Sequence, residues 1–281
     1  MRTAILVLVA LFALSCTNAK PTVYVGCTPE HQDVRSFLGI PLKDSVDFIR
    51  WNFIINGDQY ELDATYGVGK PGTPGFYKDH KAVFSGKIEK QGHYYLLHKE
   101  NRTFWLQEIN PNILYLLGKN KDLLIGNGGF SYTLQIAGAS KTSDFFGVSE
   151  KPTNKSVLYY EGRTPCTAMD SMQGLQKGPS CNKLKWYLAF YRDPVTGKPS
   201  HYLQNGGGYD WHIMYRGKWE IIEEKNNRIN IKLTPDDSHP PLYLVRLNDD
   251  LLYFTDAKGN LLVGDTDFSY VMNRREKELV R

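Results

Sequence analysis

Short runs of alternating apolar and polar residues, separated by turn-forming residues, recur along most of the chain. The run FIRWNFII at 48–55 ends in Asn-Gly-Asp, a hairpin signal, and QYELDATY follows it at 59–66. The same alternation appears in LKWYLAFY at 184–191 and in two paired runs within 219–233. Such spacing predicts an all-β chain that folds as sandwiches or small closed barrels, and closure is attractive because it removes exposed strand edges.

Helical spacing is rare in the chain. The segment EHQDVRSFLG at 30–39 is the exception, because it follows Pro29, carries weak helical periodicity and ends in glycine. One short helix is therefore expected there.

The strongest signal is an internal repeat. Residues 113–134 align without gaps to 251–272, and eight of the 22 positions are identical, including Phe-Ser-Tyr in the same register. Earlier matches keep the same order: VYVGCTP faces YYEGRTP, Trp51 faces Trp186, and SGKIEK faces RGKWEI. A period this long indicates tandem domains rather than a solenoid.

The repeat sets the expected domain organisation. The first unit spans 23–136 and the second spans 158–273, with a polar linker rich in Ser, Thr, Lys and Gly at 137–157 and a charged tail at 274–281. Matching glycine-rich stretches, GVGKPGTPGF at 67–76 and QNGGGYDWHI at 204–213, indicate long loops at one mouth of each unit. A partner or ligand could touch the protein at these loops.

The first residues resemble an export signal. MRTAILVLVALFALSC has a basic start and an apolar run that is too short to span a bilayer. The favoured interpretation is a bacterial lipoprotein signal peptide at 1–16, with Cys16 as the acylated residue and a tether at 17–22. The alternative is ordinary cleavage after Ala19, which would give a secreted or periplasmic protein.

Composition narrows the function classes. The 34 basic and 30 acidic residues give a net charge of only +4, with no long basic run, which argues against nucleic-acid binding. No motif of nucleophilic or metal-dependent hydrolysis is present, so we expect no enzymatic activity. Candidate partners are the membrane, through the N-terminal lipid, and another envelope protein.

Residues around Cys166 leave three possibilities open. Cys166, Met169 and Met172, with His212 as a fourth ligand, could bind Cu(I), because soft sulfur ligands favour that ion. In an oxidising compartment Cys166 could instead pair with Cys181 across a loop of roughly 15 residues. It could also do neither, since the first unit keeps the same pattern without these residues.

The motifs YYEGRTPC and GKW and the ladder ending LLYFTDAKG, together with the lipoprotein-like start, resemble the NlpE-type copper-resistance lipoprotein family. The resemblance covers about 110 residues of the second unit and reaches the first unit mainly through the repeat. It implies two small antiparallel lipocalin-like β-barrels, a place in the bacterial envelope, commonly the outer membrane, and roles in stress sensing and copper homeostasis. It implies no catalysed reaction.

The chain departs from this family at one informative place. The family has Cys-x-x-Cys after the proline, whereas here Cys166 is followed by Thr167, Ala168 and Met169. A dithiol redox centre therefore cannot be carried over.

Aromatic residues offer a last candidate site. In a barrel they could line a cavity for an apolar ligand, although such side chains commonly fill the core. The candidates are Trp51, Tyr66, Trp105, Trp186, Trp211 and Trp219. The sequence as a whole predicts a non-catalytic envelope lipoprotein that acts as a binding or sensing module, with metal handling and lipocalin-like carriage as alternatives.

Overall fold

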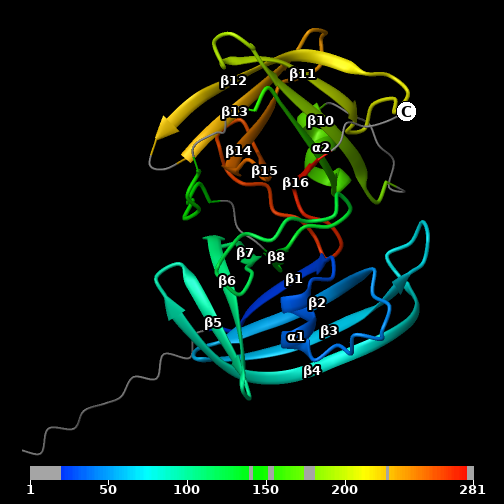
Figure 1. The fold of residues 1–281 in the computed structure, drawn as a ribbon, viewed down its shortest axis with the longest axis vertical. Helices are drawn as coiled ribbons and strands as arrows, with labels where there is room; N and C mark the ends of the chain where they lie inside the picture. The colour runs from blue at the N-terminus through cyan, green and yellow to red at the C-terminus, as the bar shows by residue number, and fades with distance from the viewer. Residues whose placement is uncertain (1–19, 139–141, 151–154, 174–180, 226–227, 277–281) are drawn as a thin grey trace, which may run out of the picture.

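Two closed antiparallel barrels of eight strands each follow one another along the chain (Figure 1). The computed structural model describes residues 20–138, 142–150, 155–173, 181–225 and 228–276. The first barrel comprises β1 (Thr22–Thr28), β2 (Phe48–Asn56), β3 (Gln59–Gly69), β4 (Phe76–Gln91), β5 (Tyr94–Lys99), β6 (Arg102–Asn110), β7 (Ile113–Leu116) and β8 (Thr133–Ile136). The second comprises β9 (Val157–Thr164), β10 (Leu184–Arg192), β11 (Pro199–Gly206), β12 (Tyr215–Lys225), β13 (Arg228–Pro235), β14 (Leu242–Asn248), β15 (Leu251–Thr255) and β16 (Val271–Arg275).

Each barrel is a meander in which neighbouring strands in the sequence are neighbours in space. β8 closes the first barrel on β1, and β16 closes the second on β9. The Asn-Gly signal forms the β2–β3 hairpin, where Gly57 has the positive φ of 64° that such a turn requires. The expected all-β fold with two tandem barrels is confirmed.

A short helix follows the first strand of each barrel. α1 (Gln32–Leu38) buries Val34 and Phe37 in the first core and ends at Gly39, whose left-handed backbone caps it. Helix α2 (Cys166–Gln173) lies at the equivalent place and buries Met169 completely. The sequence predicted α1 but not α2.

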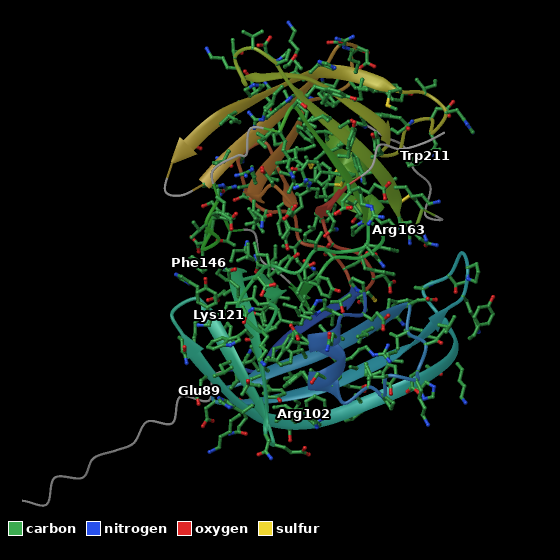
Figure 2. The ribbon with its side chains drawn as sticks, viewed as in Figure 1. Glu89, Arg102, Lys121, Phe146, Arg163 and Trp211 are labelled. Atoms are coloured by element: carbon green, nitrogen blue, oxygen red, sulfur yellow. A yellow bond between two sulfur atoms is a disulfide. The ribbon has the colours of Figure 1, made fainter. Side chains whose placement is uncertain are left out.

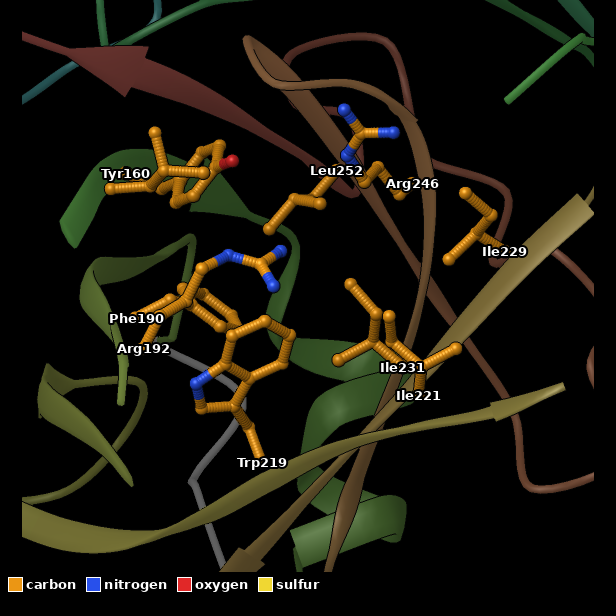
Figure 3. A pocket seen from close by; sticks show the side chains of 10 residues that line it. Tyr160, Phe190, Arg192, Trp219, Ile221, Ile229, Ile231, Arg246 and Leu252 are labelled. Carbon is orange, nitrogen blue, oxygen red and sulfur yellow. The ribbon is translucent and has the colours of Figure 1, made fainter. Parts of the chain in front are cut away.

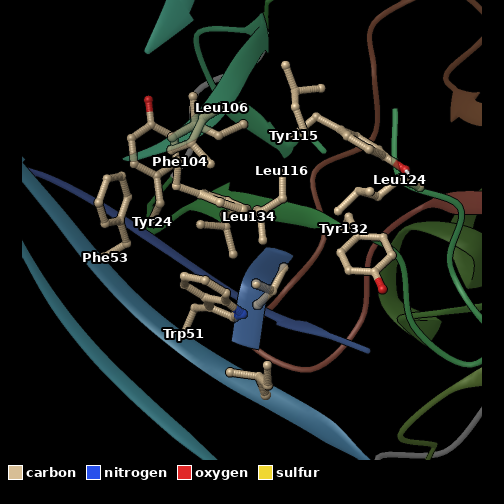
Figure 4. Close-up of a cluster of buried hydrophobic side chains, with 14 of the residues drawn as sticks. Tyr24, Trp51, Phe53, Phe104, Leu106, Tyr115, Leu116, Leu124, Tyr132 and Leu134 are labelled. Atoms are coloured by element: carbon tan, nitrogen blue, oxygen red, sulfur yellow. Dashed lines mark hydrogen bonds between the residues drawn. The ribbon is translucent and has the colours of Figure 1, made fainter. Parts of the chain in front are cut away.

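The repeat extends to matching hydrogen bonds inside the cores, in each case from a buried tryptophan; Figure 4 shows Trp51 in the core of the first barrel. The indole of Trp51 donates to the Thr28 hydroxyl at 2.9 Å, and that of Trp186 donates to Thr164 at 2.8 Å. Both tryptophans are almost completely buried. These bonds satisfy the one polar group of each indole, so the ring can fill the barrel without a desolvation penalty.

The two barrels contact each other through the same residues of the repeat, related by an approximate two-fold axis. Phe130 stacks on its counterpart Phe268, with ring centroids 5.9 Å apart, and the Ser131 and Ser269 hydroxyls are hydrogen-bonded at 2.6 Å. A hydrogen bond from each barrel to the other is repeated in the same way. Gly126 N–H donates to Asn273 Oδ1, and the equivalent Gly264 N–H donates to Gln135 Oε1, where Gln135 is the counterpart of Asn273. Such reciprocity is the geometry of a two-fold interface, here within one chain.

Apolar packing strengthens this interface. The buried cluster of the first barrel continues into the outer face of the second, through Val245, Leu247, Leu251, Tyr253, Leu261 and Val271. Residues 142–150 of the expected linker also touch both barrels: Phe146 N–H donates to Ile109 O, and Glu150 N–H donates to Leu247 O. This described part of the linker is therefore packed rather than loose.

Candidate functional site

The loop between β11 and β12 presents the chain's densest group of exposed apolar side chains. Trp211, Ile213 and Met214 expose 40%, 48% and 36% of their surface within four consecutive residues. We call Trp211–Met214 the apolar loop. Exposed apolar side chains are ordinary when scattered, but a cluster on one loop marks a surface for contact with another molecule.

Three consecutive glycines let this loop fold back on the barrel end. Gly206, Gly207 and Gly208 all have left-handed backbones, with φ of 70°, 67° and 96°. A Cβ on Gly206 would come within 2.6 Å of the Trp211 ring, and a Cβ on Gly207 within 2.3 Å of the Trp186 ring. Only glycine allows both the backbone conformation and this close approach.

Hydrogen bonds then fix the loop's shape. The buried side chain of Asn205 donates from Nδ2 to the carbonyls of Trp211 and Ile213, both at 2.7 Å. At the tip, the Asp210 carboxylate accepts from His212 N–H at 2.8 Å. The loop is thus held in one conformation before any contact, which lowers the entropic cost of binding.

The equivalent loop of the first barrel is used differently. Its Pro74 carbonyl accepts a hydrogen bond from Arg50, and the same guanidinium pairs with Asp267 of the second barrel at 2.7 Å. The residue of the first barrel that corresponds to Asp267 in the repeat is Gly129, which has no carboxylate. The apolar loop therefore lacks the ion-paired anchor that ties the Pro74 loop to its neighbour.

The structure places the tryptophans that were candidates for a ligand cavity in different surroundings. Trp51 and Trp186 fill opposite cores, whereas Trp211 lies at the surface of the second barrel, outside its interior (Figure 2). Trp219 is buried, and its indole donates to Tyr191 O at 2.7 Å. Trp51, Trp186 and Trp219 are thus buried in the barrels, as aromatic side chains in small barrels commonly are, and Trp211 is not part of either core.

The second barrel does contain a narrow cavity at the end opposite α2 (Figure 3). The Arg192 guanidinium lies 5.0 Å from the Trp219 ring centroid at its mouth, above apolar lining residues such as Leu158 and Ile231. Its volume is only about 20 Å³. A water molecule fits, whereas carriers of organic ligands enclose roughly 300–1,000 Å³.

Cys166 and Cys181 form a disulfide, with their Cα atoms 6.1 Å apart. This confirms the pairing that the sequence left open and takes the Cys166 sulfur out of the proposed copper set. Met169 is completely buried in the core, Met172 is half-buried and His212 is exposed on the apolar loop. Among the described residues, no group of three or more His, Cys, Asp or Glu side chains is placed to hold a metal ion. With Cys166 in the disulfide, the candidate copper set lacks its thiolate ligand.

Cys27 is a free thiol buried between the barrels. Its Sγ donates to Thr266 O at 3.3 Å, across the interface. Burial raises the pKa of the Cys27 thiol to about 12, against the lowering effect of Arg50. Because the thiolate is the nucleophile, this thiol is expected to be unreactive while the barrels stay packed.

We predict that iodoacetamide leaves Cys27 unmodified in the folded protein at pH 8 and modifies it fully in urea. The folded-state pKa lies well above pH 8, so the buried group stays protonated. Intact mass spectrometry without reduction would show no adduct in buffer and one adduct in urea on the chain from residue 20 onward. An adduct in buffer would show that the interface opens or that the thiolate forms.

No helix in the described part of the chain is long and apolar enough to cross a membrane. Cys16, the expected site of lipid attachment, and the whole expected signal peptide lie outside the described residues. Comparison with protein-family models, with curated proteins and with solved structures gives no match. The function of this protein must therefore be inferred from the geometry of the chain itself.

The sequence predicted a contact loop at 204–213, which contains Asn205 and Ile213, but it did not predict which of its side chains are exposed or what holds them. A signal was nevertheless present: three glycines, which favour a turn, directly precede a segment that holds Trp211 and two further apolar residues. Apolar residues in a segment that cannot be a strand have no core face to occupy.

Proposed function

We propose that this chain is a non-catalytic binding protein of the bacterial cell envelope, attached through lipid on Cys16, and that the apolar loop is its contact surface. The NlpE-type resemblance supports the location and the lipid. The observation that carries the binding role is the apolar loop, in which three exposed side chains are held by Asn205 and by left-handed glycines.

The alternatives have less support. Copper handling through Cys166 requires the disulfide to be reduced first, since its sulfur is bonded to Cys181. Carriage of an apolar ligand requires a far larger cavity than about 20 Å³. A contact module needs neither feature and requires an exposed apolar patch, which the second barrel has.

Site-specific photo-crosslinking in intact cell envelopes tests this proposal. A photoreactive amino acid at position 213 should give discrete adducts. The matched control is position 195, in the β10–β11 hairpin of the same barrel, where Val195 is 91% exposed and thus more accessible than Ile213. Adducts of equal yield at both positions, or none at position 213, would contradict a specific contact surface.

A further inference from the structure

Cationic side chains lie beside the apolar loop. Lys185 and Arg163 are direct partners across the β9–β10 ladder, so their side chains share the outer face of the barrel, and Lys183 lies two residues before Lys185. The Lys185 carbonyl accepts a hydrogen bond from Gly207 N–H at 2.7 Å. Both that carbonyl and the Trp211 ring lie against Gly206, which places the backbone of Lys185 beside the exposed tryptophan.

These charges reinforce one another. Burial lowers the pKa of Lys183, the nearby Arg163 and Lys185 lower it further, and Asp267 raises it. Such mutual repulsion shows that the three groups form one positive cluster, which an anion would relieve.

Two neighbouring carboxylates pair with other cations, and a third accepts a backbone amide. Asp267 pairs with Arg50 at 2.7 Å, Glu161 pairs with Arg275 at 3.5 Å, and Asp210 accepts the amide of His212. Within the described chain, no carboxylate lies at ion-pair distance from Arg163, Lys183 or Lys185. Lys185 is exposed, whereas Arg163 and Lys183 are half-buried, and Lys183 lines a pocket together with Asp265 and Asp267.

We propose that the apolar loop and this cluster together bind an anionic lipid surface, with Trp211, Ile213 and Met214 entering the interface while Arg163, Lys183 and Lys185 contact lipid phosphates. This inference rests on the proposed function and names the partner. Tryptophan favours the membrane–water interface, and basic residues beside an apolar segment are attracted to anionic lipid.

A lipid surface fits the observations better than a protein partner does. A stable protein interface buries roughly 800 Å² on each side, with about 20–30 residues. Three exposed apolar side chains and three cations offer much less, whereas insertion into lipid needs only a few apolar groups and charge attraction. A short loop of this kind would orient a protein that a lipid on Cys16 already holds at the membrane.

Vesicle binding tests the proposal on the chain from residue 20 onward, which contains every described residue and lacks the lipid-bearing cysteine. The probes are vesicles of phosphatidylcholine alone and of phosphatidylcholine mixed with phosphatidylglycerol. We expect binding to be at least about tenfold stronger to the mixed vesicles and to weaken as salt is added. Tryptophan emission should shift to the blue, because Trp211 is the one tryptophan that is exposed in the described chain.

Two sets of variants separate the contributions. Replacing Arg163, Lys183 and Lys185 by Gln should reduce binding to mixed vesicles by about tenfold or more. The matched control, Lys43, Lys78 and Lys87 to Gln, removes the same charge from exposed positions of the first barrel and should change binding little. For the apolar part, Ile213→Ser should weaken binding and Val195→Ser should not.

Binding without preference for anionic lipid, or equal weakening by both charge variants, would overturn the lipid proposal. The crosslinker at position 213 then distinguishes failure of the lipid proposal from failure of the proposed binding role. Adducts with lipid support both proposals. Adducts with a protein alone overturn the lipid surface but keep the binding role, and the absence of adducts overturns both.

Discussion

Gly207→Ala is expected to lower the free energy of unfolding by about 2–5 kcal/mol, the largest effect predicted for a single methyl group in this protein. The left-handed backbone at this position, with φ of 67°, costs an L-residue about 1–2 kcal/mol. The new Cβ would also lie 2.3 Å from the Trp186 ring, which is 1% exposed and bonded to Thr164. The ring has no room to retreat, and overpacking of this kind costs about 1–3 kcal/mol.

Gly197→Ala is the matched control. Gly197 has the same φ of 67°, but within the described chain no atom beyond its sequence neighbours lies within 4 Å of the place that a new Cβ would take. Its expected cost is therefore only the backbone part, about 1–2 kcal/mol. Urea unfolding of both variants measures the difference directly. Equal destabilisation would mean that the Trp186 layer yields easily and that the glycine-rich turn is chosen for its backbone alone.

Loss of the Cys166–Cys181 disulfide is expected to lower the free energy of unfolding by about 3 kcal/mol. The bond closes a sequence separation of 15 residues and ties the start of α2 to the segment that leads into β10. Without it the unfolded chain gains freedom, while α2 keeps its buried Met169 as its main attachment to the core. The Cys166→Ala, Cys181→Ala double variant, unfolded in urea, gives the value.

A reducing agent provides the internal control for that measurement. It should destabilise the wild-type protein by the same amount as the double substitution and should leave the double variant unchanged. Cys27 remains in both proteins and is already a thiol, so reduction does not alter it. A reductant effect on the double variant would point to a different disulfide, and no effect on the wild type would show that the bond contributes little to stability.

The sequence by itself determined the repeat, the strands, helix α1 and the presence of two tandem all-β units. These features depend on local patterns: alternation with a period of two places residues on one face of a strand, and turn residues mark where strands end. The sequence left sandwiches and closed barrels open, and the expectation of barrels came from the NlpE-type resemblance. The Cys166–Cys181 disulfide could be predicted as one possibility, because the spacing of the two cysteines allows it. Spacing alone could not choose between the disulfide and a metal site, since the choice depends on how the two Cβ atoms are placed.

The tertiary structure decided which side of each pattern is buried and against what. Trp186 and Trp211 are both aromatic positions of the second unit, yet one fills the core and the other is exposed, because Gly206 and Gly207 turn the chain over the barrel end. Helix α2 is fixed by the disulfide and by Met169 rather than by helical periodicity.

The contact between the two barrels also could not be predicted from the sequence. The sequence shows that Phe-Ser-Tyr occurs twice, but only folding shows that Phe130 meets Phe268 and Ser131 meets Ser269. The same two-fold arrangement explains the difference between the Pro74 loop and the apolar loop. Arg50 beside the Pro74 loop pairs with Asp267, whereas the equivalent residue for the apolar loop is Gly129, which has no carboxylate. An alternating pattern records which residues share a face, whereas the partner of that face depends on contacts between residues far apart in the chain.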